Sequence, residues 1–391
     1  MTSVRDHDIP KATYRTPPLT MPNAIAFFPW VSVDEIIDAG TVRLLPYRRG
    51  QHPGCRPEIS QTDMDSVLAA YADHPHMPIA RASVLELENW ASGSEVTDHL
   101  DALFRARNAI AFSALSQRKL FSGSFNYCNY DAYTLVVQAL RPGQAGSFAF
   151  TTRRRDGGTN HHWSSDEFAF HRPNHVDSRA VVSIDKRLLE AALRIDPTKS
   201  PGLYEALVEF CCANTDSPDI PEHVELVMMK SAFELLLDID QKADSFTRAI
   251  ESTIGDLLPA SELHGPLEDE WKKRRPHATR ILDAWAREFC AVRGMSAHGK
   301  QRDADRFVWP ARTHLAFTSM LFPLVFKKRL ASEGLFEIDS YDVERLRCIE
   351  DYLLHDPFTF DWRTDQTHPW TEIDNTALIS AKAHLFYPAS Q

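Results

Sequence analysis

Arg293 and His298 are the two residues of this sequence whose types and spacing best suit chemistry. Five positions separate them, and Gly299 follows the histidine directly. A histidine titrates near neutral pH, so it can take or give a proton during a reaction. An arginine is permanently charged and can hold a phosphate. The pair therefore suits chemistry on a phosphate ester.

The sequence predicts that a helix over residues 279–298 positions this pair. Large apolar side chains recur along one side of that helix, at Ile281, Trp285, Phe289, Val292 and Met295. At 100° per residue, Arg293 and His298 fall on opposite flanks of this stripe. Because glycine commonly ends helices, Gly299 should leave His298 in the last turn, where the helix dipole favours the imidazolium form.

The segment Arg293-Gly-Met-Ser-Ala-His298-Gly299 resembles the R-x4-6-H motif of the HEPN superfamily. Its "AHG" ending is similar to the Apea-like HEPN branch, found in prokaryotic anti-phage and abortive-infection proteins. The sequence AFELLL at 232–237 resembles part of the family's first bundle helix, and the likeness covers about residues 222–354. Many members carry a polar residue where this chain has Gly294, and Ser296 is the nearby hydroxyl that could substitute.

The resemblance implies a metal-independent endoribonuclease that needs no cofactor. RNA carries its own nucleophile, the 2′-OH, so such an enzyme needs a proton-transfer group and a cation for the charge that develops on phosphorus. His298 would move the proton, Arg293 would stabilise the phosphate, and Ser296 would assist. Family enzymes usually form homodimers in which two motifs face one cleft. The implied setting is phage defence or a toxin-like stress response, with RNA as the target and tRNA among the candidates.

The charge distribution supports a local site for a polyanion. The chain of 391 residues has a net charge of -11, which argues against a general polyanion binder. Residues 267–312 reverse this balance, with eleven Lys and Arg against seven Asp and Glu. We expect RNA phosphates to contact the basic residues of this stretch, namely Lys272, Lys273, Arg274, Arg275, Lys300, Arg302 and Arg306. The alternative is a solvated connector whose cations pair with Glu268, Asp269 and Glu270.

Composition and cysteine usage predict a globular cytoplasmic protein. Apolar residues make up 43% of the chain, and its six cysteines include no C-x-x-C pair. Scattered free cysteines suit a reducing compartment. The longest apolar stretch, 315–326, is too short to span a bilayer and predicts a buried helix. Residues 1–22 are polar and proline-rich, and they lack the apolar segment of a signal peptide. No membrane contact is expected.

The predicted fold is an α+β N-terminal domain followed by an all-α, HEPN-like helical bundle. We expect a flexible tail at 1–22, the α+β domain at 23–201 and the helical domain at 218–391. In the first half, periodicity and turn residues predict strands at 26–31 and 41–45, a helix at 96–117, a long hairpin joining 147–151 to 167–171, and a helix at 186–193. Arg107 interrupts the apolar face of the helix at 96–117, so it must find a partner. This half could sense or restrain, by binding a regulatory ligand or a phage component.

In the second half, helices are predicted after Pro221, at 243–258, at 310–332 and at 340–354. Pro323 is expected to kink the helix at 310–332, and Gly334 is expected to end it.

Two other functions remain open on the sequence. The chain could be a non-catalytic, HEPN-like module for RNA binding or dimerisation, in which Arg293 and His298 only contact a ligand. It could also be a zinc-dependent hydrolase that uses His161, His162, Asp166 and His171, although their spacing fits no familiar metal pattern. Metal-independent cleavage of RNA would separate the first proposal from both alternatives.

Overall fold

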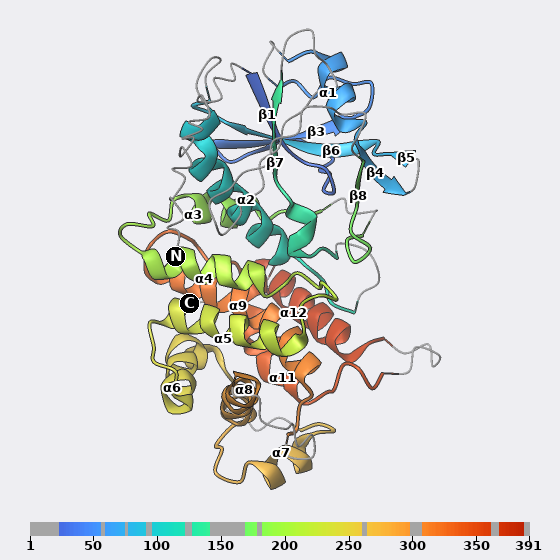
Figure 1. Cartoon of the computed structure of the whole chain (residues 1–391). Coiled ribbons are helices and arrows are strands. Elements are labelled where there is room, and N and C mark those ends of the chain that lie inside the picture. The colour runs from blue at the N-terminus through green and yellow to red at the C-terminus, as the bar shows by residue number, and fades with distance from the viewer. Residues whose placement is uncertain are drawn as a thin grey trace, which may run out of the picture.

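The computed structural model describes residues 23–55, 59–74, 77–90, 96–121, 127–140, 169–177, 182–259, 264–297, 307–360 and 367–386. The expected tail at 1–22 and most of the hairpin predicted for 147–171 lie outside these residues. Strands gather at one end of the molecule and helices build the rest (Figure 1). The prediction of a mixed α and β region followed by a mostly helical part is therefore confirmed.

The larger sheet is antiparallel, with the strand order β2-β3-β6-β1-β7. Its strands are β1 (Asn23–Phe28), β2 (Ile37–Asp38), β3 (Val42–Arg48), β6 (Arg81–Leu87) and β7 (Val136–Leu140). Strand β1 lies between β6 and β7, and the register sets its Ala26 opposite Leu85 on one side and Val137 on the other. Side chains 24–28 are all buried, so both faces of this strand are covered. Helix α1 (Gln61–Leu68) is tied to β3 by the Tyr47 hydroxyl, which donates to Asp65.

A second, small sheet joins β4 (Tyr71–His74), β5 (Met77–Pro78) and β8 (Phe170–His171). Strand β8 is the end of the strand predicted for 167–171, and it pairs in parallel with β4. The rings of Tyr71 and Phe170, which are opposite each other in this register, stack with their centroids 5.1 Å apart. The other strand of the predicted hairpin, 147–151, lies outside the described residues.

The helix predicted at 96–117 is present as a 3-10 turn, η1 (Val96–His99), followed by α2 (Leu100–Leu115). The expectation that Arg107 needs a partner is confirmed. Its Nε donates to the carbonyl of Tyr133 at 2.8 Å, and its guanidinium lies 4.3 Å from the ring centroid of Tyr130. Both tyrosines belong to the 3-10 turn η2 (Tyr130–Tyr133). A backbone acceptor and an aromatic face thus satisfy a cation on an otherwise apolar helix face.

Three helices connect the sheets to the helical part. They are α3 (Lys186–Leu193), α4 (Pro201–Cys212) and α5 (Glu222–Leu237). Helix α4 packs against both α2 and α5, so the stretch between the two predicted domains carries a helix that contacts both. One cluster of buried apolar side chains continues from β1 through α4 to α12.

The helical part contains α6 (Ala243–Ile254) with the 3-10 turn η3 (Gly255–Leu257), α7 (Glu268–Arg274), α8 (Ile281–Ala297), α9 (Ala311–Ser332), α10 (Ser340–Arg347), α11 (Ile349–Leu353) and α12 (Pro369–Phe386). Helix α9 continues through Pro323, and Gly334 follows it with a left-handed φ of +71°, as expected for a glycine that ends a helix. The helix predicted at 340–354 is instead divided at Cys348. Within the described ranges, no helix is long and apolar enough to cross a bilayer.

Candidate active site at the end of helix α8

Helix α8 carries the predicted motif and lies at the end of the molecule opposite the sheets (Figure 1). Its predicted apolar stripe is buried at Ile281, Trp285, Phe289 and Val292, whereas the fifth member, Met295, is only partly buried. The rings of Trp285 and Phe289 stack with centroids 5.4 Å apart, and Phe317 of α9 meets Trp285 edge-on at 4.7 Å. The stripe therefore sets the rotation of α8 about its own axis and leaves the flank with Arg293 outside the core.

Charged contacts fix α8 near its start. The guanidinium of Arg280 donates from Nε to Glu350 at 3.0 Å and from Nη2 to the carbonyl of Pro259 at 2.9 Å. About two turns further along, Arg287 donates to Asp283 at 2.7 Å and to Asp244 of α6 at 2.6 Å. These contacts join α8 to α11 and to α6.

Glu288 is a buried anchor that the sequence analysis did not identify. Its side chain is fully buried and accepts from the backbone N–H of Trp309 at 2.8 Å and from Arg275 at 3.2 Å. The imidazole of His314 is also fully buried, with Nε2 3.7 Å from the Glu288 carboxylate, and neither of its ring nitrogens has a hydrogen-bond partner. A signal for Glu288 was present, because 100° per residue places this acid in the middle of the apolar stripe.

Arg293 lies near the C-terminal end of α8, beyond all of these contacts. Its side chain is half-buried, and its Nε is buried without a hydrogen-bond partner. No carboxylate of the described residues forms an ion pair with it, whereas Arg280, just before α8, and Arg287, on α8, are both paired. Arg293 is thus a cation whose charge the described part of the fold leaves uncompensated.

The neighbouring Lys230 of α5 and Cys290 of α8 are not reactive groups. Lys230 is buried, pairs with Glu234 at 2.7 Å and lies 4.6 Å from the ring centroid of Phe246. Burial raises the pKa of the Cys290 thiol to about 11, although the cations Lys230 and Arg293 oppose that shift. Cys290 is therefore protonated at neutral pH and unsuited to act as a nucleophile.

Two of the residues proposed for catalysis, His298 and the side chain of Ser296, lie outside the described structure. Helix α8 is described as far as Ala297, the residue before His298. His298 and the three cations Lys300, Arg302 and Arg306 fall in the undescribed stretch 298–306, and the side chain of Ser296 is also not described. The described structure resumes at Phe307, and the backbone N–H of Trp309 donates to Glu288 of α8. The roles predicted for these residues stay predictions.

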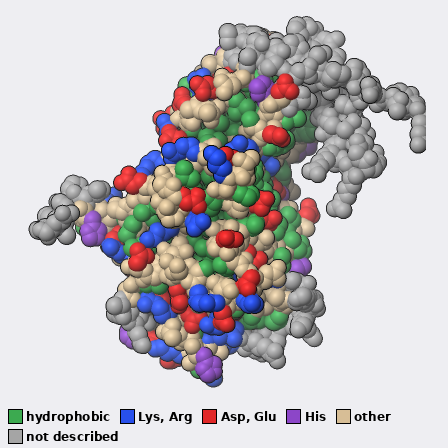
Figure 2. All heavy atoms as spheres, turned by 90° about the vertical axis from the view of Figure 1, so that its left-hand side faces the viewer, with side chains coloured by type: hydrophobic (Ala, Val, Ile, Leu, Met, Phe, Trp, Pro, Cys, Tyr) green, Lys and Arg blue, Asp and Glu red, His purple; other side chains and the backbone are tan. Residues whose placement is uncertain are grey.

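The basic residues 272–275, which the sequence suggested as a connector, lie within α7 and at its C-terminal cap. Lys272 pairs with Glu268 and Arg274 with Glu270, each at 2.8 Å, and Arg275 pairs with the buried Glu288. Two of these pairs are the ones the solvated-connector alternative predicts. Lys273 is exposed and has no ion pair with a described residue. On the face drawn in Figure 2, acidic and basic side chains are likewise interleaved.

Of the four residues proposed as zinc ligands, the structure describes one. His171 lies in β8, and His161, His162 and Asp166 fall outside the described residues. Across the described ranges, no group of three or more His, Cys, Asp or Glu side chains is placed to hold a metal ion. The six cysteines are all free.

Comparison of the chain with protein-family models, with curated proteins and with solved structures finds no match.

Proposed function

We propose that this chain is a metal-independent endoribonuclease of HEPN type, acting in the cytoplasm in phage defence or a toxin-like stress response. The observation that carries the proposal is the state of Arg293. It lies near the end of a helix that is fixed at its start, and its buried Nε has no hydrogen-bond partner. No described carboxylate neutralises it, and His298 follows the last described residue of that helix. A phosphate is the counterion that such a guanidinium suits best.

The proposed reaction is attack of the RNA 2′-OH on the adjacent phosphorus. His298 takes the proton of the 2′-OH as the 2′ oxygen bonds to phosphorus, and Arg293 stabilises the negative charge of the phosphorane. The bond from phosphorus to the 5′ oxygen then breaks, and this oxygen leaves with a proton. The products are a 2′,3′-cyclic phosphate and a 5′-hydroxyl. A homodimer would supply a second imidazole for the second proton transfer.

The N-terminal part is proposed to regulate this reaction by binding a regulatory ligand or a phage component. What supports this role is its physical connection to the helical part. Lys327 of α9 lies 2.9 Å from Asp185 at the start of α3 and 2.7 Å from Asp342 of α10. A movement of α3 would therefore alter the contacts of α9 and α10.

The test is cleavage of labelled RNA, with total tRNA as the first substrate, by the purified full-length chain in the presence of EDTA. Cyclic-phosphate ends should form, and Arg293→Ala and His298→Ala should each lower the rate by at least about a hundredfold. Arg287→Gln is the matched control, because this arginine lies on the same helix but is already paired with two carboxylates. Binding without cleavage would support the non-catalytic module, and cleavage that EDTA abolishes would contradict the proposal.

A further inference from the structure

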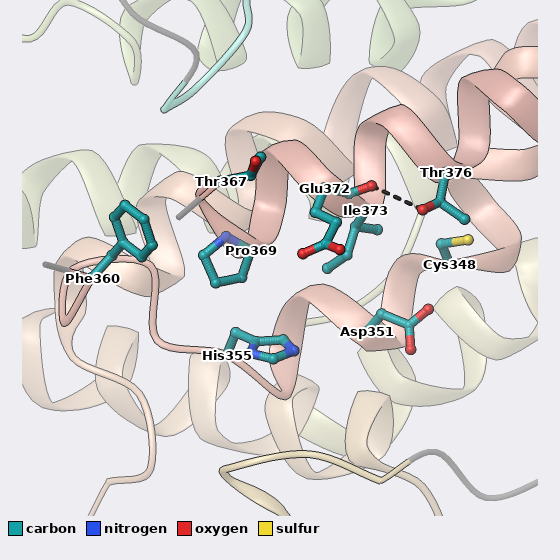
Figure 3. Close-up of a pocket in the computed structure, with 9 residues that line it drawn as sticks. All are labelled: Cys348, Asp351, His355, Phe360, Thr367, Pro369, Glu372, Ile373 and Thr376. Carbon is teal, nitrogen blue, oxygen red and sulfur yellow. Dashed lines mark hydrogen bonds between the residues drawn. The ribbon is translucent and has the colours of Figure 1, made fainter. Parts of the chain in front are cut away.

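A cavity of about 620 Å³ lies on the side of the helical part formed by α11, α12 and the turns that flank them. Its volume falls within the range of about 300–1,000 Å³ that is usual for small-molecule sites. Figure 3 shows α12 along one wall and α11 with its following turn along the other. Glu372, Ile373 and Thr376 come from α12, and Asp351 and His355 come from the opposite wall.

The walls of this cavity are held in place by contacts that do not use its carboxylates. The indole of Trp370 donates to the carbonyl of Tyr352 at 3.0 Å, and the Tyr352 hydroxyl donates to Asp374 at 2.7 Å. Asp374 also pairs with Arg345 at 3.2 Å. These bonds join α12 to α10 and α11, so the two helices that form opposite walls of the cavity are fixed relative to each other.

The two carboxylates that line the cavity take no part in the contacts that hold its walls. Asp351 and Glu372 form no ion pair with a described residue, in contrast to Asp374 on the same helix as Glu372. Lys and Arg are absent from the described residues that line the cavity. The described part of the lining therefore holds two carboxylates and no cation, which disfavours phosphates and other anions there.

Three groups in the cavity also have shifted pKa values, which is common where side chains gather to bind a ligand. Burial raises the pKa of Asp351, and Glu350 adds to this effect. Burial lowers the pKa of His355 against the opposing influence of Glu372, so this imidazole is neutral at pH 7 and cannot balance the carboxylates. Burial also raises the pKa of the Cys348 thiol to about 11.

We propose that this cavity binds a small organic amine, in which one ammonium group lies near Asp351 and a second near Glu372. Phe360, Pro369 and Ile373 supply apolar surface for the body of the ligand. An ammonium is favoured over a metal ion because no metal-binding group exists among the described residues. Asp351 is half-buried whereas Glu372 lies at the open side, so Asp351 should contribute more to affinity. The site is distinct from the proposed RNA chemistry and does not depend on it.

The test uses isothermal titration of the full-length chain with 1,4-diaminobutane at low salt. The uncharged 1,4-butanediol has the same length and should not bind. Asp351→Asn should weaken binding at least about tenfold and Glu372→Gln severalfold, because a charge-assisted hydrogen bond becomes a neutral one. Asp101→Asn is the charge-matched control, since Asp101 is exposed on α2, and it should change the dissociation constant less than twofold.

Three outcomes would overturn the proposal. The diamine could fail to bind, the diol could bind as well as the diamine, or all three variants could lose affinity equally, which would show only general attraction to an acidic chain. A peptide with one lysine tests the other source of an ammonium, and binding of the peptide alone would also contradict a small-molecule site. Ile373→Lys places a tethered ammonium in the cavity and should abolish diamine binding without removing a carboxylate. It thus tests the same idea if Asp351→Asn does not fold.

Discussion

Lys327 offers the sharpest test of how the two parts of the chain are joined. Its side chain is 2% exposed and lies between two carboxylates, Asp185 at 2.9 Å and Asp342 at 2.7 Å. Burial opposes its charge, but Asp342 and Asp185 outweigh that effect and raise the pKa of Lys327. Asp185 also accepts from the backbone N–H of Leu188 and so caps α3. A single ammonium therefore ties together α3, α9 and α10.

We predict that Lys327→Met lowers the free energy of unfolding by about 3–5 kcal/mol, because removing one partner leaves buried charge uncompensated. The neighbouring Lys328 is the matched control. It pairs at 3.1 Å with Asp256, whose side chain is 65% exposed, and such surface pairs contribute about 0–1 kcal/mol. Lys328→Met should accordingly cost no more than about 1 kcal/mol.

Urea denaturation followed by circular dichroism measures both variants under the same conditions. A double variant gives a further check. Asp342→Asn in the Lys327→Met background removes one of the two unpaired carboxylates, so it should recover part of the free energy of unfolding that Lys327→Met loses. Equal costs for Lys327→Met and Lys328→Met would refute the reasoning. So would a double variant that is less stable than Lys327→Met alone.

Two further predictions concern buried carboxyl groups. Burial raises the pKa of Glu225 from 4.5 to about 7, and Asp216 adds to the shift. Its contribution to stability is thus fully present below pH 4.5 and is lost as the pH rises through 7. Glu225→Gln should raise the melting temperature at pH 8 and leave it nearly unchanged at pH 5; an equal change at both values would contradict this. Glu288→Leu removes the acceptor of the Trp309 N–H and should cost about 1–3 kcal/mol in urea denaturation, whereas Glu288→Gln keeps an acceptor and should cost less. Equal costs would show that this hydrogen bond is unimportant.

The parts of the fold that the sequence predicted are those with a local periodic signal. The stripe on α8 is a case in point, because burial of Trp285 and Phe289 one turn apart is visible in the spacing alone. Helix α7 lacked such a signal, since Trp271 is its one buried residue. Helix α12 begins with Pro369 and was missed, because Trp370, Ala377 and Ala381 mark its buried face only sparsely.

Contacts between segments far apart in the sequence could not be predicted from short sequence patterns. The parallel register of β4 with β8 joins residues about a hundred positions apart, and no short pattern encodes it. The same holds at the candidate site. Sequence periodicity places Arg293 on a flank of α8, but the acids that neutralise Arg280 and Arg287, Glu350 and Asp244, come from other helices. Only the structure separates the paired arginines from Arg293.

That separation is the main physical argument for function. Carboxylates neutralise two other arginines near this one, the half-buried Arg280 just before α8 and the exposed Arg287 on α8. Arg293 departs from this pattern at the end of the helix, where its buried Nε has no hydrogen-bond partner. The contacts of Glu288 and Arg280 hold α8 in place, so the fold itself sets the position of the helix that carries Arg293. In the proposed reaction, a positioned cation that no described carboxylate neutralises would stabilise the phosphorane.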